Sequence, residues 1–256
     1  MVGAFFFKIG GKQSEASVVP TLSVPCCPNI RPWKRFLEEQ LDSVIDWHRA
    51  LRLMTRHGMS RSDAVQITQG NLCIDKVLHR RRRRQHLDAH RTRGIFEPAL
   101  RDGRPRVFAL HDREILVARV KAIRAYEVDL VPLGADRKPC GEIRTISKIH
   151  FKFGCHLDHV SRIQQAMAFA EGSVGAVEPI RKPQDRYKIS DKKLFGWIDA
   201  ACGICVKTLE GEMVTGTLSW IGRWEIGLDV FGVELVIFRH ALENIQGIRW
   251  DSFKAD

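Results

Sequence analysis

Aromatic and basic residues form two short runs near the C-terminal end of this 256-residue chain. The first run is Arg223–Trp224, and the second is Phe238–Arg239–His240. Flat rings stack on nucleobases, and arginine side chains contact phosphates or base edges. Histidine can donate a hydrogen bond to a base carbonyl, or to the ribose hydroxyl that distinguishes RNA from DNA. These residue types therefore predict a binding site for single-stranded RNA.

The same residues also have a purely structural interpretation. Trp224 and Phe238 could be core aromatics, and His240 could cap a strand, which is the more usual role of a single histidine. The register of the surrounding strands decides between the two interpretations.

Residues 204–245 supply those strands. Apolar and polar residues alternate there, and the pattern predicts a small, strongly bent antiparallel sheet. Glu210–Gly211 falls at the tight turn expected between its first two strands. Residues 190–201 come before the sheet and predict a helix with Leu194 and Trp197 on its apolar face.

An earlier part of the chain repeats this pattern. Tyr126–Leu130 reads YEVDL and corresponds to WEIGL at Trp224–Leu228. The HDRE run at 111–114 corresponds to EGE at 210–212, and the spacing from turn to run differs by one residue between the copies. An internal duplication of about 45 residues accounts for both matches.

The second copy, residues 190–246, resembles the bacterial Sm-like RNA chaperone Hfq. Gly216 matches a glycine at the bend of that family's second strand, Trp224 matches its base-stacking aromatic, and residues 238–240 match its Tyr–Lys–His run. The resemblance implies a short helix on a five-stranded open barrel, in a ring whose pore binds uridine. It also implies that Trp224 and the Phe238 of a neighbouring subunit enclose a uracil.

This chain departs from the family at several positions. Ser190 stands where the family has a glutamine that helps to hold uracil, and residues 197–202 lack the arginines of the family's RNA-annealing rim. In the first copy, Tyr126 and Lys148 match the stacking and basic positions, but no histidine follows Lys148. We therefore expect the pocket of the first copy to be weakened or lost.

The expected fold class is α+β, with an N-terminal helical segment followed by two small, strongly bent, Sm-like antiparallel β-barrels, each associated with a short helix. The expected divisions are a flexible tail at 1–30, a helical Arg-rich region at 31–95, a divergent Sm-like domain at 100–170, a linker at 171–188 and an Hfq-like domain at 189–250. Open sheet edges favour a homo-oligomeric ring, for example a trimer with six Sm-like units.

The N-terminal region has helical spacing of apolar residues. Residues 33–57 predict one helix that ends at Gly58, and Ser60 predicts the start of a second one that ends at Gly70. A third begins near Leu72. The arrangement fits a DNA-binding helix-turn-helix over residues 58–93 or a plain helical hairpin, and both stay open.

Five consecutive arginines follow, namely Arg80, Arg81, Arg82, Arg83 and Arg84. A charge run is usually only a solvated face. Adjacent arginines repel one another unless an anion is near, so we expect phosphate contacts here. Such contacts position a nucleic acid without reading its sequence.

The overall composition supports a polyanionic partner. The formal net charge is +11, and no apolar run approaches the ~20 residues of a membrane-spanning helix, so no membrane association is expected. Seven scattered cysteines argue against a secreted disulfide framework and for a cytoplasmic location. Cys202 and Cys205 form a CxxC, but without a second pair of ligands this is weak evidence for zinc, and small apolar residues at the entry to a strand are the alternative. The spacing of Cys140, Cys155, His156 and His159 fits no zinc template. No cofactor is expected.

The sequence therefore predicts a non-enzymatic RNA-binding protein that acts in post-transcriptional regulation by holding U-rich single-stranded RNA. It contains no nucleophile–base arrangement, no phosphate-binding glycine loop and no HExxH motif. Two alternatives remain. One is a regulator of transcription that binds duplex DNA and is oligomerised by its strand-rich half. The other is a scaffold for ribosome assembly.

Overall fold

The computed structural model describes residues 46–171 and 175–248. The expected tail at 1–30 and the beginning of the helix expected at 33–57 lie outside the described residues.

The chain divides into two units between Cys73 and Ile74. This boundary lies within residues 31–95, which the sequence pattern assigns to a single helical region. The described part of the first unit contains α2 (Trp47–His57) and α3 (Arg61–Thr68).

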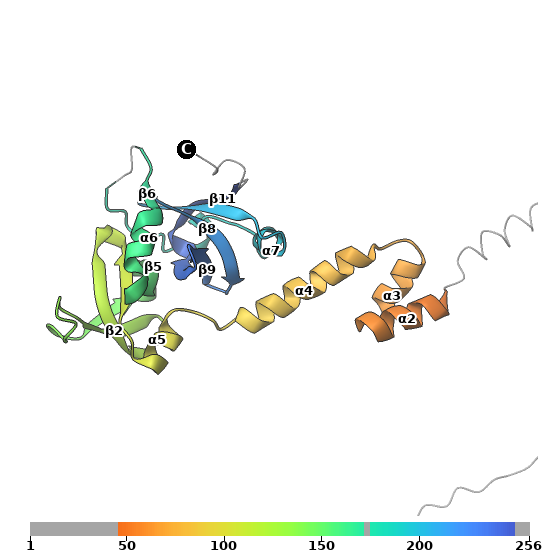
Figure 1. The fold of residues 1–256 in the computed structure, drawn as a ribbon, viewed down its shortest axis with the longest axis horizontal. Helices are drawn as coiled ribbons and strands as arrows, with labels where there is room; N and C mark the ends of the chain where they lie inside the picture. Colours follow the sequence, from red (N-terminus) through yellow and green to blue (C-terminus); the bar gives the residue numbers. More distant parts are fainter. Residues whose placement is uncertain (1–45, 172–174, 249–256) are drawn as a thin grey trace, which may run out of the picture. The chain divides into compact units, whose positions relative to one another are not determined.

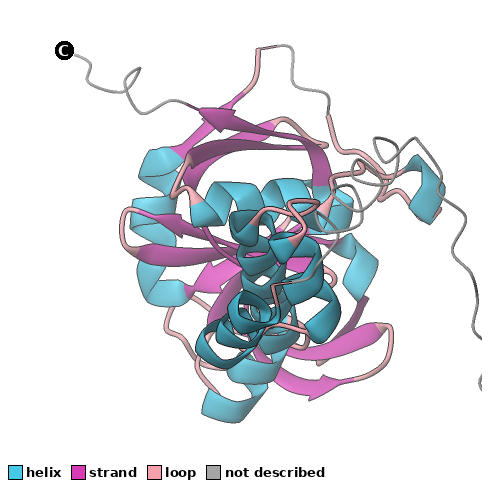
Figure 2. Ribbon diagram, turned by 90° about the vertical axis from the view of Figure 1, so that its right-hand side faces the viewer, coloured by secondary structure: helices cyan, strands magenta, loops and turns pink. Residues whose placement is uncertain are grey.

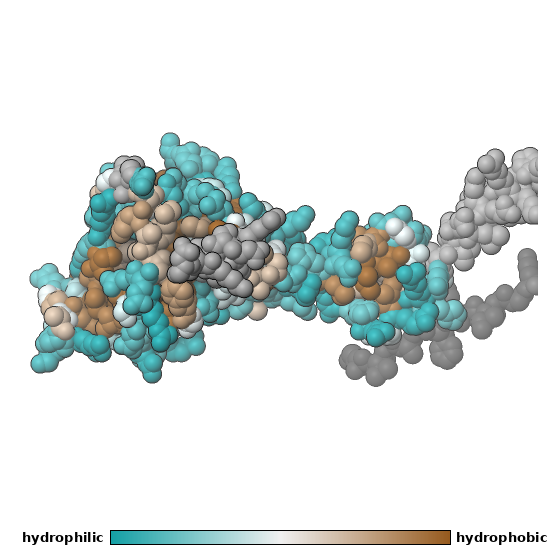
Figure 3. Space-filling view, turned by 45° about the horizontal axis from the view of Figure 1, so that its top comes forward, coloured by the Kyte–Doolittle hydropathy of each residue, from teal (hydrophilic) through white to brown (hydrophobic). Residues whose placement is uncertain are grey.

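The ends of these two helices follow the sequence signals. α2 ends at Gly58, whose backbone is left-handed, and the hydroxyl of Ser60 accepts a hydrogen bond from the Asp63 N–H at the start of α3. The predicted helix boundaries at Gly58 and Ser60 are therefore confirmed. Apolar atoms reach the surface of this unit (Figure 3), where Trp47 and Leu51 of α2 are exposed.

The second unit contains a long helix and an antiparallel sheet (Figure 1). Its helices are α4 (Ile74–His90), α5 (Phe96–Asp102), α6 (Val160–Ala166) and α7 (Asp191–Asp199). Its strands are β1 (Arg106–Leu110), β2 (Ile115–Ile123), β3 (Glu127–Pro132), β4 (Arg144–Ser147), β5 (Phe151–His156), β6 (Met167–Phe169), β7 (Gly203–Thr208), β8 (Glu212–Ile221), β9 (Glu225–Val230), β10 (Val233–Phe238) and β11 (Leu242–Ile248).

The expectation of two separate barrels is wrong. The eleven strands form one open antiparallel sheet in the order β11-β7-β8-β9-β10-β5-β1-β2-β3-β4, with β6 paired to β8. The two halves join where β10 pairs with β5, and Val236 lies opposite Gly154 at the middle of this junction. Strand edges expose unpaired backbone N–H and C=O groups, so pairing them removes two edges at once. The strands therefore continue into one sheet instead of closing two barrels.

The strand order repeats within this sheet. β1 to β5, the first strand set, have the order β5-β1-β2-β3-β4, and β7 to β11, the second strand set, have the order β11-β7-β8-β9-β10. One backbone hydrogen bond also repeats. The Lys148 N–H donates to the Tyr126 carbonyl over 2.8 Å, and the Arg239 N–H donates to the Trp224 carbonyl over 2.9 Å. Tyr126 and Trp224 therefore occupy equivalent positions in the two sets.

Apolar side chains pack on both faces of the sheet near the junction. On β1, Val107 and Ala109 belong to one core cluster, while Phe108 and Leu110 belong to another. Successive strand residues point to opposite faces, so this alternation places a core on each side of β1. Helices lie against the sheet (Figure 2): α5 packs on β2, while α4 and α7 pack on β8.

α4 is attached to the sheet by its C-terminal half. His86 Nε2 accepts a hydrogen bond from the Ile221 N–H of β8 over 3.2 Å, and Leu87 packs against the core beside it. The rings of His79 and His86 both lie against Phe195 of α7, with centroids 5.3 and 5.5 Å away. One side of α4 therefore packs against α7 and β8.

The chain after β5 forms a short helix and then a short strand. α6 ends at Ala166, and Met167–Phe169 form β6, which pairs with β8. The β8 backbone offers a free edge to these residues, and its hydrogen bonds replace those of further helical turns. The helix predicted over 190–201 is confirmed as α7, which begins with Ser190 as its cap.

Gly216 of β8 lies so close to β9 that no side chain fits. A Cβ at this position would come within 2.3 Å of the Asp229 carbonyl oxygen and within 2.9 Å of a Leu228 side-chain carbon. Gly216→Ala should therefore lower the free energy of unfolding by about 1–3 kcal/mol, measured by urea denaturation. Gly196→Ala is the control, because a Cβ there meets nothing within 4 Å and sits in a helix, where alanine should add about 0.5–1 kcal/mol. Equal effects of the two substitutions would contradict this account.

Candidate nucleic-acid interface

A cavity of about 980 Å³ opens between the two strand sets. It is lined from the first set by the β2–β3 turn and the connection from β4 to β5, and from the second set by the β8–β9 turn and residues after β10. Six of the residues that the sequence singles out line it, namely Tyr126, Lys148, Arg223, Trp224, Phe238 and His240. The sequence placed these residues in two separate pockets, and the structure brings them into one.

Two equivalent hairpin turns present the aromatic rings. Arg223 and Trp224 form a two-residue turn that the Gly222 N–H closes onto the Glu225 carbonyl over 2.9 Å. Tyr126 lies in the corresponding turn of the first set, which an equivalent 2.9 Å bond closes. Trp224 is 59% exposed and Tyr126 is 81% exposed. Turn backbone that is held on both sides can present a large ring to solvent, and both rings are available for stacking.

Arg223 is placed to support Trp224. Its guanidinium carbon lies 4.7 Å from the centre of the Trp224 ring, which is a cation–π distance. A base stacked on the Trp224 ring would therefore meet a cation that is already beside it.

Phe238 is not a stacking surface in this structure. Its side chain is 2% exposed and packs against Phe96, Phe151 and the His240 ring, with ring centres 5.5–5.9 Å away. The expected enclosure of a base between Trp224 and Phe238 is therefore corrected. The last residue of β10 points into the core beside β5, because the junction of the two sets covers it.

Arg239 and Lys148 are also held differently from the expectation. The Arg239 guanidinium forms an ion pair with Asp191 over 2.9 Å and donates to the Ile189 carbonyl over 3.0 Å, and the residue does not line the cavity. The Lys148 ammonium donates to the Arg124 carbonyl over 2.7 Å, although its side chain lines the cavity. Arg239 therefore anchors the segment before α7 in this structure and does not contact a ligand in the cavity.

His240 links the two strand sets. Its Nε2 donates to the Phe151 carbonyl over 2.9 Å, so this nitrogen carries the proton. Burial lowers the pKa of His240 to about 4, and the hydrogen bond to the Phe151 carbonyl only partly offsets this effect. At neutral pH the ring is uncharged, and its Nδ1 lone pair is an acceptor. His240 therefore suits a ribose hydroxyl, which can donate, better than a base carbonyl.

Several basic residues of the cavity were not singled out by the sequence. Arg91 and Arg93 follow α4, and Arg181 and Arg186 lie in the segment before α7. Arg93 forms an ion pair with Glu234 over 2.7 Å. These arginines are far apart in sequence and belong to irregular segments, so no spacing pattern marks them. Together with Lys148 and Arg223 they give the cavity six basic side chains.

Glu225 is a buried acidic residue of this site that sequence analysis missed. Its side chain is 7% exposed, lines the cavity and accepts a hydrogen bond from the Ile95 N–H over 2.9 Å. Burial raises the pKa of Glu225 to about 8, and the nearby Glu97 adds to the effect. A glutamate at the start of a strand gives no sequence signal of such burial.

The arginine run lies on α4 and points in several directions. Five consecutive helical residues turn through more than a full circle, so Arg80 to Arg84 cannot all share one face. Arg82 forms an ion pair with Asp199 of α7 over 3.1 Å, while Arg80 and Arg84 are exposed. Part of the run thus fixes α4 to the sheet unit, and the exposed members provide positive charge outside the cavity.

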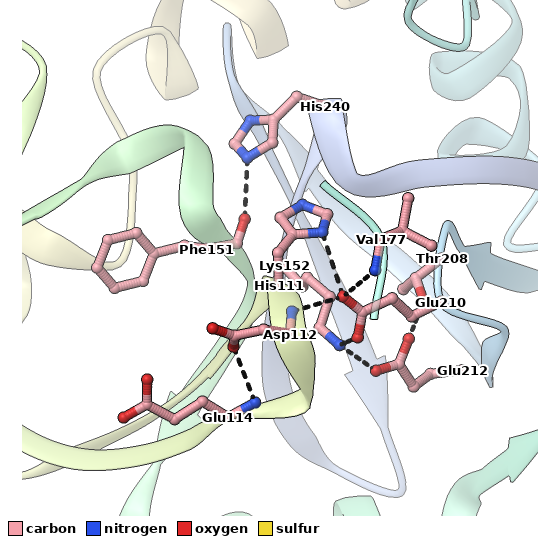
Figure 4. A network of polar contacts seen from close by, with 10 residues as sticks. All are labelled: His111, Asp112, Glu114, Phe151, Lys152, Val177, Thr208, Glu210, Glu212 and His240. Carbon is pink, nitrogen blue, oxygen red and sulfur yellow. Dashed lines mark hydrogen bonds and ion pairs between the residues drawn. The ribbon is translucent and has the colours of Figure 1, made fainter. Parts of the chain in front are cut away.

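A buried polar network joins the strand sets next to the cavity (Figure 4). Lys152 of β5 is 1% exposed, and its ammonium group forms ion pairs with Glu210 and Glu212 of the second set. The Thr208 hydroxyl also donates to Glu212. A buried ammonium group needs such partners, because the loss of its hydration costs several kcal/mol. The network therefore holds β5 against the β7–β8 turn.

Glu210 connects this network to the β1–β2 turn. One of its oxygens accepts the Asp112 N–H over 2.8 Å and lies 3.5 Å from Nδ1 of His111. Burial alone would raise the pKa of Glu210, but the hydrogen bonds from Lys152 and from the Asp112 N–H outweigh it and leave the pKa below its ordinary value. Burial lowers the pKa of His111, so this ring is neutral beside the ion pairs.

Within the residues that the structure describes, no group of three or more His, Cys, Asp or Glu side chains is placed to hold a metal ion. Cys140, Cys155, His156 and His159 therefore do not form such a group. Burial raises the pKa of the Cys155 thiol to about 11, so it is not a nucleophile at neutral pH.

The chain matches no protein-family model, and no curated protein or solved structure is significantly similar to it. The resemblance of residues 190–246 to Hfq therefore stays a prediction from the sequence. Among the helices that the structure describes, none has the length and apolar character needed to cross a membrane.

Lys152→Met would leave Glu210 and Glu212 buried without a counter-charge. We expect the free energy of unfolding to fall by about 3–5 kcal/mol, measured by urea denaturation at neutral pH. Lys207→Met is the matched control, because it breaks the more exposed 2.9 Å ion pair with Glu243, which should contribute less than about 1 kcal/mol.

Restoring charge balance should recover part of the loss. Adding Glu210→Gln and Glu212→Gln to Lys152→Met removes both uncompensated carboxylates, so this triple variant should be more stable than the single one. A Lys152→Met variant no less stable than Lys207→Met would show that the network does not hold the two strand sets together.

Proposed function

We propose that this protein binds single-stranded RNA, preferentially U-rich, in the cavity between its two strand sets, as a non-enzymatic factor of post-transcriptional regulation. The observation that carries the proposal is the meeting of two exposed aromatic rings, Tyr126 and Trp224, in one cavity with six basic side chains. Stacking on a flat ring tolerates any base, and cations neutralise the phosphates. The combination suits a flexible single strand better than a duplex, whose bases are already stacked.

Each part of the cavity has a role in this proposal. A base stacks on Trp224, with Arg223 beside the ring, and a second base stacks on Tyr126 of the equivalent turn. The Nδ1 atom of neutral His240 accepts the hydrogen of a 2′-hydroxyl, which favours RNA over DNA. Arg91 and Arg186 contact phosphates at the rim.

The exposed arginines of α4 add affinity that does not depend on sequence. Phosphate contacts of this kind fix the position of a strand without reading its bases. Binding of duplex DNA by the helices of residues 58–93 is the competing function. The part of α4 that packs on α7 and β8 through His79 and His86 is unavailable to DNA in the described structure.

Replacing Trp224 with Ala tests the cavity. Binding of labelled U-rich RNA should weaken by about 1–3 kcal/mol through loss of stacking, while the dependence of affinity on salt stays unchanged. The measurement is fluorescence anisotropy with U-rich RNA, A-rich RNA and duplex DNA of equal length at two salt concentrations. Phe231→Ala is the matched control, because Phe231 is 72% exposed at the tip of the β9–β10 hairpin and does not line the cavity. Equal losses for the two variants would contradict the proposed site.

The arginine run is tested by replacing Arg80, Arg81 and Arg84 with Gln, and keeping Arg82 because it pairs with Asp199. All nucleic acids should bind more weakly, and the slope of log affinity against log salt should fall by up to about 2 for a single strand. A U-rich preference that disappears in this variant and persists in Trp224→Ala would assign recognition to α4. Tighter binding of duplex DNA than of RNA by the wild-type protein would favour the regulator of transcription.

Self-association is the natural use of the two remaining sheet edges. β4 and β11 end the sheet, and they are the equivalents of β10 and β5, which pair with each other inside the chain. A second copy could therefore pair its β11 with β4 in the same manner. Light scattering of the purified 29.2 kDa chain should give a multiple of that mass, and a strictly monomeric protein would contradict the pairing.

A further inference from the structure

Glu225 occupies an unusual place for an acidic residue. It directly follows Trp224, lines the cavity and is 7% exposed. Its described partner is the Ile95 N–H, which donates to Oε2 over 2.9 Å, and no basic side chain of the described residues forms an ion pair with it. Burial of a carboxyl group without a counter-charge raises its pKa and so favours the protonated form.

The equivalent residue of the first strand set shows the contrast. Glu127 directly follows Tyr126, as Glu225 follows Trp224, and both residues close the same two-residue turn through their carbonyl oxygens. The Glu127 side chain is 47% exposed and forms an ion pair with Arg124 over 3.8 Å. The same residue type at the same position is therefore hydrated in one set and buried against the cavity in the other.

We propose that Glu225 is a protonated hydrogen-bond donor of the cavity, which offers its carboxyl O–H to a carbonyl oxygen of the base that stacks on Trp224. This inference rests on the proposed RNA-binding function and adds a group that reads the base. A carboxylic acid donates through its O–H, whereas a carboxylate only accepts. The Ile95 N–H occupies Oε2, so Oε1 is the oxygen that can carry the proton.

The groups around Glu225 favour the acid form. Glu97 of α5 also lies beside Gly94, where an added Cβ would be 3.1 Å from a carboxyl oxygen of each glutamate. Glu97 and Glu234 of β10 both disfavour a second negative charge, while Lys148 and the Ile95 N–H favour it. Burial is the largest effect, and together they raise the pKa of Glu225 to about 8.

Binding should therefore depend on the protonation of Glu225. The neutral acid places no negative charge among the basic residues of the cavity, and it can donate to the base. Once ionised, it cannot donate, and it repels a carbonyl oxygen at the same position. Affinity should be highest below the pKa of Glu225 and should fall as the pH rises through about 8.

The test is the affinity of the full chain for labelled oligouridylate from about pH 6.5 to about pH 9 at constant ionic strength. Wild-type affinity should fall by up to about tenfold per pH unit above the pKa of Glu225. Glu225→Gln keeps the shape and a donor, so its affinity should change little over the same range. Any titration of the RNA itself is common to both proteins and cancels in the comparison.

Two further variants sharpen the result. Glu127→Gln is the matched control and should keep the wild-type pH profile, because Glu127 is already hydrated. Glu97→Gln should move the fall in affinity to lower pH, because removing a neighbouring negative charge makes Glu225 easier to ionise. A Glu225→Gln variant that keeps the wild-type pH profile would overturn the inference and leave RNA binding itself intact.

Failure of the proposed function has a different signature. A wild-type protein that binds no RNA at any pH would contradict both proposals. The protonation state of Glu225 can still be measured without ligand. The carboxylic acid signal in infrared difference spectra between wild type and Glu225→Gln should be present at neutral pH and should disappear above the pKa of Glu225. Its absence at neutral pH in the folded protein would also overturn the inference.

Discussion

The arrangement of the sheet unit depends on the buried ion pairs between Lys152 and two glutamates. The Lys152 ammonium group projects from β5 of the first strand set and is enclosed by carboxylates of Glu210 and Glu212 from the second. None of the three charges could stay buried alone, because removing an ion from water costs several kcal/mol that only a partner offsets. The two strand sets must therefore meet here, and the pairing of β10 with β5 continues the same contact through the backbone.

This junction also explains where the cavity lies. Once β10 and β5 are paired, the β8–β9 turn of one set and the β4–β5 connection of the other line the same cavity. His240 bridges the same gap through the Phe151 carbonyl. The sequence repeat alone gives each set one aromatic turn, whereas the junction places Tyr126 and Trp224 in a single cavity. The site is consequently a property of the pair of sets, and neither set alone contains it.

Local signals in the sequence predicted local structure well. Helices begin after Ser60 and Ser190, and Glu210–Gly211 lie in the turn between β7 and β8, because caps and turns depend on neighbouring residues. The pairing of β10 with β5 could not be predicted in this way, since no residue pattern at a strand edge indicates which other strand will pair with it. The sequence also does not show which distant residues come into contact. Phe238 was therefore predicted to stack on a base, although it is buried against Phe96 and Phe151, and the burial of Glu225 was not predicted.

Three titratable side chains near this junction are buried or partly buried, and the cost of their burial is offset in different ways. Lys152 forms ion pairs with carboxylates, burial lowers the pKa of His240 to about 4, and burial raises the pKa of Glu225 to about 8. His240 lowers stability as pH falls from 6.5 toward 4, because the unfolded chain binds a proton that the folded one does not. Glu225 lowers stability as pH rises from 4.5 toward 8, by the opposite argument. Between pH 4.5 and 6.5 the two effects on stability have opposite signs. The free energy of unfolding should therefore change less with pH in this range than it would with either group alone.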